Sequence, residues 1–124
     1  MTAMTENTLV IYHNARCSKS RSACELIAAR GLNAKIIDYL AHPPGKAELR
    51  SLLNKLGMRP AELVRRGEEV FKTHFAGKTL SDDEWLDALV AHPILIERPI
   101  VVRGDKAVIG RPTEKVQELL DADD

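Results

Sequence analysis

Two short apolar runs, separated by a helical pattern near the start of the chain, constrain the fold most strongly. The segments "TLVIYH" at 8–13 and "AKIIDY" at 34–39 are predicted to be strands. Between them, apolar residues recur at helical spacing from Ser18, and Gly31 is a natural C-terminal cap. A strand–helix–strand unit has a right-handed crossover, and its two strands lie parallel. The loop before the helix therefore lies at the carboxyl end of the first strand, where α/β proteins usually place their sites.

A helical block is predicted after "HPPG" at 42–45, where paired prolines break the chain. Leucines at helical spacing predict a helix over 49–56, and a second, short helix is expected over 60–66. The sequence "SDDE" at 81–84 places a glutamate three residues after a serine, which predicts a capping box at the start of another helix. Pro93 marks the end of that helix.

The C-terminal part is predicted to contain a hairpin and a last helix. Two β-branched runs around "GD" predict the hairpin over 100–110, and "RPTEKVQELL" predicts a helix over 111–120 with Pro112 in its first turn. The order is then β-α-β, a helical insertion at about 43–92, and β-β-α. This is the order of a thioredoxin-like α/β fold with a mixed sheet, and we predict a single such domain over 1–124.

The charge balance excludes some classes of function. Lysine and arginine total 18, as do aspartate and glutamate, so the chain of 124 residues has no net charge. We therefore expect no nucleic-acid partner and no membrane partner. The N-terminal apolar run, Leu9 to Tyr12, is too short for a signal peptide or a membrane span. We expect a cytoplasmic protein, with a monomer as the working expectation.

The stretch "HNARCSKSR", from His13 to Arg21, carries the main chemical signal. It places Cys17 at the start of the predicted helix, where free N–H groups and the helix dipole favour an anion. Basic residues of the same stretch are expected to add positive charge and to lower the pKa of the thiol further: His13, Arg16, Lys19 and Arg21. The alternative is that Cys17 is simply a small residue at a helix start.

The second cysteine, Cys24, is expected to be a core residue because its helical neighbours are apolar. Seven residues along one helix span about 10 Å, whereas a disulfide needs Cα atoms within about 7 Å. We therefore expect no disulfide between Cys17 and Cys24. His13 and Cys17 have no further ligands at zinc-like spacing, so no metal site is predicted.

A low thiol pKa alone gives little catalysis. Lowering it by two units raises the thiolate fraction at pH 7 about 25-fold but lowers the nucleophilicity of the thiolate about eightfold. The net gain is about threefold, so positive groups around the electrophile must contribute more. Because "CSKS" is not a Cys-x-x-Cys motif, an external thiol must regenerate Cys17, and glutathione is the obvious candidate.

With these motifs the chain resembles a known family, the glutaredoxin-coupled arsenate reductases, nearly from end to end. The family pattern His-Asn-Pro-x-Cys-x-x-Ser-Arg is matched by "HNARCSKSR", with Ala15 in place of the proline. An Arg-Pro-Ile-Val-Val segment begins at Arg98, and a later Arg-Pro begins at Arg111. The resemblance also implies a cis peptide bond between Arg98 and Pro99.

The resemblance implies a role for each matching residue. Cys17 would be the nucleophile, with His13 and Ser20 as further members of the catalytic motif. Arginines would bind the oxyanion, and these are Arg65, with Arg66 adjacent to it, Arg98, Arg111 and Arg21. Arginine forks match tetrahedral oxyanions in geometry and charge.

The implied activity is reduction of arsenate to arsenite through a Cys17 adduct, with no bound cofactor. Glutathione would be the co-substrate and glutaredoxin the partner that clears the mixed disulfide. Two alternatives remain open. One is a thiol-responsive regulator of the Spx type that binds RNA polymerase, although many of these carry Cys-x-x-Cys where Ser20 stands here. The other is a glutathione-dependent reductase of a different substrate.

Overall fold

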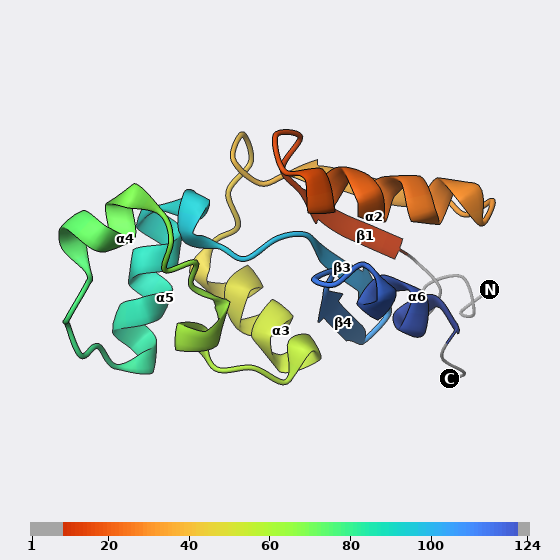
Figure 1. Ribbon diagram of the computed structural model, residues 1–124. Helices are drawn as coiled ribbons and strands as arrows, with labels where there is room; N and C mark the ends of the chain where they lie inside the picture. The colour runs from red at the N-terminus through yellow and green to blue at the C-terminus, as the bar shows by residue number, and fades with distance from the viewer. Residues whose placement is uncertain (1–8, 122–124) are drawn as a thin grey trace. The chain divides into compact units, whose positions relative to one another are not determined.

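The chain divides into two compact units. The computed structural model describes residues 9–121. One unit, the sheet unit, contains the described residues up to Tyr39 and from Arg98 onward, and the other, the helical unit, spans Leu40–Glu97. The helical unit therefore extends a few residues beyond both ends of the predicted insertion at about 43–92. Figure 1 labels most of the helices and strands of both units.

The sheet unit is built on a four-stranded mixed sheet, as predicted, with strand order β2-β1-β3-β4. Strand β1 (Leu9–His13) pairs in parallel with β2 (Ala34–Asp38). On its other side β1 pairs antiparallel with β3 (Ile100–Arg103), which continues into β4 (Lys106–Ile109) through the predicted hairpin. The predicted first strand began at Thr8, which lies outside the described residues. β1 is thus a central strand that ends at His13, just before the cysteine loop.

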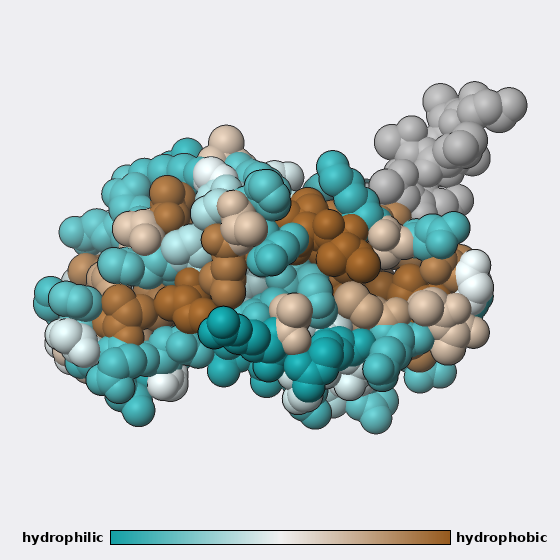
Figure 2. Space-filling model, turned by 90° about the horizontal axis from the view of Figure 1, so that it is seen from above, coloured by the Kyte–Doolittle hydropathy of each residue, from teal (hydrophilic) through white to brown (hydrophobic). Residues whose placement is uncertain are grey.

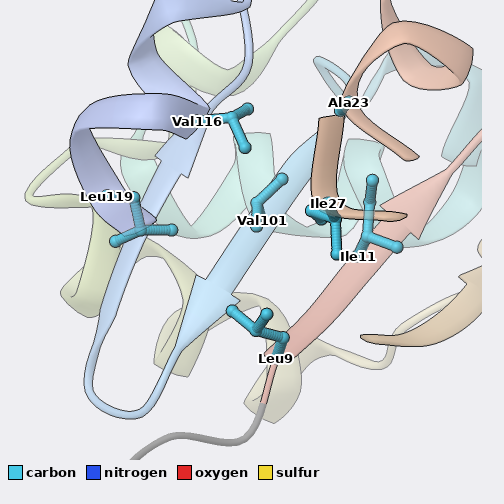
Figure 3. Close-up of a cluster of buried hydrophobic side chains, with 7 residues drawn as sticks. All are labelled: Leu9, Ile11, Ala23, Ile27, Val101, Val116 and Leu119. Atoms are coloured by element: carbon cyan, nitrogen blue, oxygen red, sulfur yellow. The ribbon is translucent and has the colours of Figure 1, made fainter. Parts of the chain in front are cut away.

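Helices α2 (Ser18–Ala29) and α6 (Glu114–Asp121) pack on the sheet through one apolar cluster. Figure 3 shows side chains from both helices meeting side chains from β1 and β3. All seven residues of the cluster are buried: Leu9, Ile11, Ala23, Ile27, Val101, Val116 and Leu119. Burial of this shared apolar surface fixes the start of α2 relative to the segment that precedes α6.

The prediction for the last helix was wrong at its start. We expected the helix to include Arg111 and Pro112, but α6 begins at Glu114. The backbone N–H of Arg111 instead donates to the Ile109 carbonyl at 2.8 Å, and that of Gly110 donates to the Pro99 carbonyl at 2.8 Å. Because a residue before proline also avoids helical conformation, the segment bends at Arg111 and Pro112 and enters α6 only at Glu114.

The helical unit contains three α-helices and two 3₁₀ turns among its described residues. The predicted short helix over 60–66 is a 3₁₀ turn, and the helix that follows it was not predicted. The elements are α3 (Lys46–Leu56), a turn at Pro60–Leu63, α4 (Glu69–His74), α5 (Asp82–Ala91) and a turn at Pro93–Leu95. Gly57 ends α3 in the left-handed region, with φ of 68°, which favours glycine.

The predicted capping box at the start of α5 is confirmed. The Ser81 hydroxyl accepts from the Glu84 N–H at 3.2 Å, and the Glu84 carboxylate accepts from the Ser81 N–H at 2.8 Å. Lys46 of α3 forms ion pairs with Asp83 and Asp87 of α5 at 2.8 and 2.9 Å. These contacts join α3 and α5 at the surface of the unit.

The surface of the protein is mixed in character. Figure 2 shows hydrophobic residues lying between hydrophilic ones on the face seen from above. On the sheet unit, Ile36 of the edge strand β2 is 58% exposed. No helix within residues 9–121 is both long enough and apolar enough to cross a membrane.

Candidate active site

Cys17 lies where the sequence predicted it, between β1 and α2. It is the N-cap residue of α2, with extended backbone angles of φ −94° and ψ 122°. Its backbone N–H donates to the Asn14 carbonyl at 2.9 Å, which closes a turn over residues 14–17. We call this turn the thiol loop. The thiol is half-buried, so it remains accessible to a reactant.

Arg111 reaches this thiol from the C-terminal part of the chain. Its Nη2 lies 3.1 Å from the Cys17 Sγ, although the two residues are 94 positions apart in sequence. Its Nε donates to the Arg98 carbonyl at 2.6 Å. The guanidinium is therefore held at two points, with one edge on the backbone before β3 and the other on the sulfur.

The pKa of Cys17 lies below its ordinary value, as predicted. Burial raises this pKa, but hydrogen bonds from the backbone N–H groups of Ser20 and Lys19 outweigh the burial, together with the charge of Arg111 and the Ser20 hydroxyl. We expected four basic residues near Cys17 to supply the added charge. In the structure the acting charge is that of Arg111, and Lys19 contributes through its backbone.

Ser20 is completely buried beneath the thiol loop. Its hydroxyl accepts from the Asn14 N–H at 3.3 Å and forms a hydrogen bond with Cys17. Ser20, the serine of the family motif, therefore lies against the sulfur of Cys17. Its place in the motif has a physical basis, because a hydroxyl donor stabilises a thiolate.

His13, the other predicted catalytic residue, contacts the second cysteine. Its Nδ1 lies 3.7 Å from the Cys24 Sγ. Burial lowers the pKa of His13, the charge of Asp38 raises it, and the charge of Arg21 lowers it, with a net decrease. The lowered pKa disfavours the imidazolium form, so His13 supplies less positive charge than we expected from it.

Cys24 has the surroundings of a core thiol, as predicted. It is partly buried and packs against the apolar cluster of the sheet unit. It lines an apolar cavity of about 190 Å³ beside α2 and β2. Burial, followed by the charge of Glu25, raises the pKa of this thiol, so the two cysteines are shifted in opposite directions. Both are free.

Arg98 and Arg21 take different positions in the sheet unit. Arg98 is 7% exposed, and the peptide bond between it and Pro99 is cis, as predicted. A second cis bond, between Arg111 and Pro112, was not predicted. Arg21 is exposed, and its Nη1 donates to the Ala15 carbonyl at 2.8 Å. Arg21 therefore bonds to the thiol loop from the solvent-exposed side.

Arg65 and Arg66 differ clearly within the helical unit. The Arg65 backbone N–H donates to the Leu95 carbonyl at 2.7 Å, and its Nε pairs with the Glu68 carboxylate at 3.3 Å. Its Nη1 is buried and has no hydrogen-bond partner among the described residues. Arg66 instead lies over the Phe71 ring, at 5.2 Å from the centroid. Of these two arginines, Arg65 is therefore the one whose buried Nη1 donor has no partner among the described residues.

The sheet unit gathers hydrogen-bond donors around the Cys17 sulfur. Within the described part of the chain, no three His, Cys, Asp or Glu side chains are grouped so that they hold a metal ion. What the sheet unit does assemble is a guanidinium and two backbone N–H donors around the sulfur of Cys17, whose pKa they lower. This arrangement suits nucleophilic attack on an anionic electrophile.

Comparison with known proteins places the chain in a family. The model of the family described as "ArsC family" matches residues 12–119, which is most of the chain. The protein belongs to the ArsC family. An arsenate reductase of Neisseria meningitidis serogroup A is 41% identical over 112 residues, which cover 89% of this chain and 96% of that protein.

One further similar sequence and one similar solved structure were found for this ArsC-family protein. YfgD of Escherichia coli, an uncharacterized protein, is 46% identical over 112 residues, covering 89% of this chain and 94% of that one. The structure of an arsenate reductase from Vibrio cholerae superposes with a TM-score of 0.86 at 42% identity, covering 90% of this chain and 97% of that chain. The thioredoxin-like fold that we predicted is therefore confirmed.

Proposed function

We propose that this protein reduces arsenate to arsenite, with glutathione and glutaredoxin as the source of electrons. The observation that carries the proposal is the 3.1 Å contact between Arg111 Nη2 and the Cys17 sulfur. Relatives named as arsenate reductases, which align over nearly their whole length, support the same substrate.

The physical problem in this reaction is repulsion between two anions. Arsenate carries one to two negative charges at neutral pH, and the attacking thiolate carries another. A guanidinium beside the sulfur offsets this repulsion and offers paired N–H donors to the arsenate oxygens. The contact of the Arg111 guanidinium with the Cys17 sulfur supports this role. The same guanidinium donates to the backbone carbonyl of Arg98. The role of Arg65 in the helical unit stays a prediction.

The proposed chemistry runs in three balanced steps. The Cys17 thiolate bonds to arsenic of the singly charged, dihydrogen form of arsenate, and one arsenate oxygen leaves as water with both of the arsenate protons. The sulfur of glutathione then attacks the Cys17 sulfur, the electron pair of the S–As bond stays on arsenic, and arsenite leaves. A glutaredoxin thiol finally takes the glutathionyl group and returns Cys17 to its reduced form.

An external thiol donor is supported by the cysteines of this chain. The sequence contains two cysteines. Cys24 packs against the apolar cluster beside His13, and its raised pKa disfavours the thiolate. Seven residues along α2 separate it from Cys17, which is too far for a disulfide without unwinding the helix. The second thiol must therefore come from another molecule, and glutathione is the abundant one in a reducing cytosol.

The deciding experiment is a coupled assay with arsenate, glutathione, glutaredoxin, glutathione reductase and NADPH. We expect arsenate-dependent NADPH oxidation that disappears in Cys17→Ser and persists in Cys24→Ala, the matched control. Omission of glutaredoxin is expected to slow turnover, and its replacement by thioredoxin and thioredoxin reductase is expected not to restore it. Turnover with thioredoxin alone contradicts the proposed donor, and absence of arsenate turnover with either system contradicts the reductase itself.

A further inference from the structure

Asn14 is a buried polar residue that the sequence analysis did not assign to the site. It follows β1 directly and is 4% exposed. Its side-chain Oδ1 accepts from the Arg16 N–H at 3.0 Å, and its backbone carbonyl accepts from the Cys17 N–H at 2.9 Å. Its backbone N–H donates to the Ser20 hydroxyl at 3.3 Å. One residue thus bonds to three different points around the thiol.

The first two bonds fix the backbone that carries the sulfur. With the Arg16 N–H held by the Asn14 side chain, residues 14–17 form a closed turn. That turn leaves Cys17 extended at the N-cap of α2, where the backbone N–H groups of Lys19 and Ser20 act on its sulfur. Without the Oδ1 acceptor, the Arg16 N–H needs another partner and the turn loses its side-chain closure.

The third bond acts on the Ser20 hydroxyl. A hydroxyl has one proton to donate and two lone pairs that accept. The Ser20 oxygen accepts from the Asn14 N–H with a lone pair, and the proton of the same hydroxyl is the one that Ser20 donates to the Cys17 sulfur. A stable position of Asn14 therefore keeps this donor directed at the thiolate.

We propose that Asn14 is a positioning residue for the Cys17 thiolate, acting through the turn of the thiol loop and through Ser20. The proposal rests on the proposed function only in treating Cys17 as the reacting group. Other charged groups on the thiol loop and α2 are Arg16, Lys19, Arg21 and Glu25, and Arg111 contacts the sulfur from the C-terminal segment. Removal of the Asn14 amide changes none of these charges, so its effect reports on geometry.

The test is the pH profile of Cys17 alkylation by iodoacetamide, a neutral reagent, with the two cysteines resolved by peptide mass spectrometry. Each profile is divided by its own high-pH plateau, which gives the thiolate fraction and removes changes in nucleophilicity. In Asn14→Ala we expect the midpoint to move upward and the thiolate fraction below the midpoint to fall about three- to tenfold. Asn14→Ser, whose hydroxyl is able to accept the same N–H, should recover most of the loss.

Two controls separate positioning from a general effect on stability. Asn54→Ala, at an exposed position of α3, should keep the wild-type profile. Asn14→Gln keeps the amide but extends it by one carbon, so we expect it to behave like Asn14→Ala. Wild-type profiles in folded Asn14→Ala, or in Asn14→Gln if the alanine variant does not fold, overturn the proposal. The assay contains no arsenate, so its outcome is independent of whether the protein proves to be an arsenate reductase.

Discussion

Replacement of Arg111 by alanine is the sharpest test of how the site works, because this residue touches the reacting sulfur. The side chain has two bonds to lose, one of 3.1 Å from Nη2 to Cys17 and one of 2.6 Å from Nε to the Arg98 carbonyl. The second bond only holds the guanidinium in place. The energetic effect on the reaction therefore comes from the first bond and from the bonds that the same group makes to arsenate.

The magnitude follows from the distance and from the exposure of the pair. At 3.1 Å, two unit charges in an effective dielectric constant of about 20 attract by roughly 5 kcal/mol, which is an upper limit. Both residues are only partly buried, so water reduces this value. A charge-assisted hydrogen bond measured by mutation is typically worth about 1.5–3 kcal/mol. Arg111→Ala should thus lower kcat/KM for arsenate by about 10- to 150-fold.

Two assays on the same variant distinguish the effect of Arg111 on arsenate from its effect on the Cys17 thiol. Steady-state arsenate reduction gives kcat/KM, and the plateau rate of iodoacetamide alkylation reports on the thiolate with a neutral electrophile. The alkylation plateau should change far less than kcat/KM, while the alkylation midpoint moves to higher pH because the charge of Arg111 lowers the pKa of Cys17. Arg111→Lys, which keeps the charge but loses the fork, should lie between alanine and wild type. Equal kcat/KM in the wild type and in Arg111→Ala refutes the reasoning.

The remaining predictions concern the backbone before Arg111 and the arginine pair of the helical unit. Gly110→Ala places a methyl group 2.9 Å from side-chain atoms of both Pro99 and Val116, so urea denaturation should show a loss of about 1–3 kcal/mol in the free energy of unfolding, and an unchanged value contradicts the close packing. Arg65→Ala should lower kcat/KM for arsenate by about 10-fold or more, because Arg65 has an unused buried donor, whereas Arg66→Ala should leave it nearly unchanged. The reverse order of the two effects in steady-state kinetics contradicts the assignment.

The sheet and the thiol were predictable from the sequence because their signals are local. The strand before His13, the helical spacing after Ser18 and the capping box at Ser81 each lie within a dozen residues. Gly57 likewise marks the end of α3 by its own backbone preference. These features need no knowledge of the rest of the chain, and the structure has them where the patterns indicate.

The errors arise where distant contacts overrule local preference. The segment before Glu114 satisfies a helical pattern, but the Gly110 N–H bonds to the Pro99 carbonyl and the Arg111 N–H bonds to the Ile109 carbonyl, so the helix begins only at Glu114. No pattern in the sequence indicated that His13, at the end of β1, contacts Cys24 on α2, and its catalytic role stays a prediction. A signal for Asn14 was available in its position directly after a strand, because asparagine there often accepts a backbone N–H two residues ahead.

The contacts that lower the pKa of Cys17 are expected to speed the step in which Cys17 is the leaving group more than the step in which it is the nucleophile. Lowering the pKa of a thiol by two units gains only about threefold in attack, because the added thiolate is a weaker nucleophile. When glutaredoxin takes the glutathionyl group in the proposed cycle, however, Cys17 is the leaving group, and a thiol of low pKa leaves faster. Cys17 does not attack in that step, so its own thiolate fraction and nucleophilicity do not affect the rate. The faster departure of a low-pKa thiol is therefore not offset. Arg111, Ser20 and the N–H groups of α2 all stabilise the charge that develops on the departing sulfur. In the proposed cycle, the donors around Cys17 therefore favour its return to the reduced form.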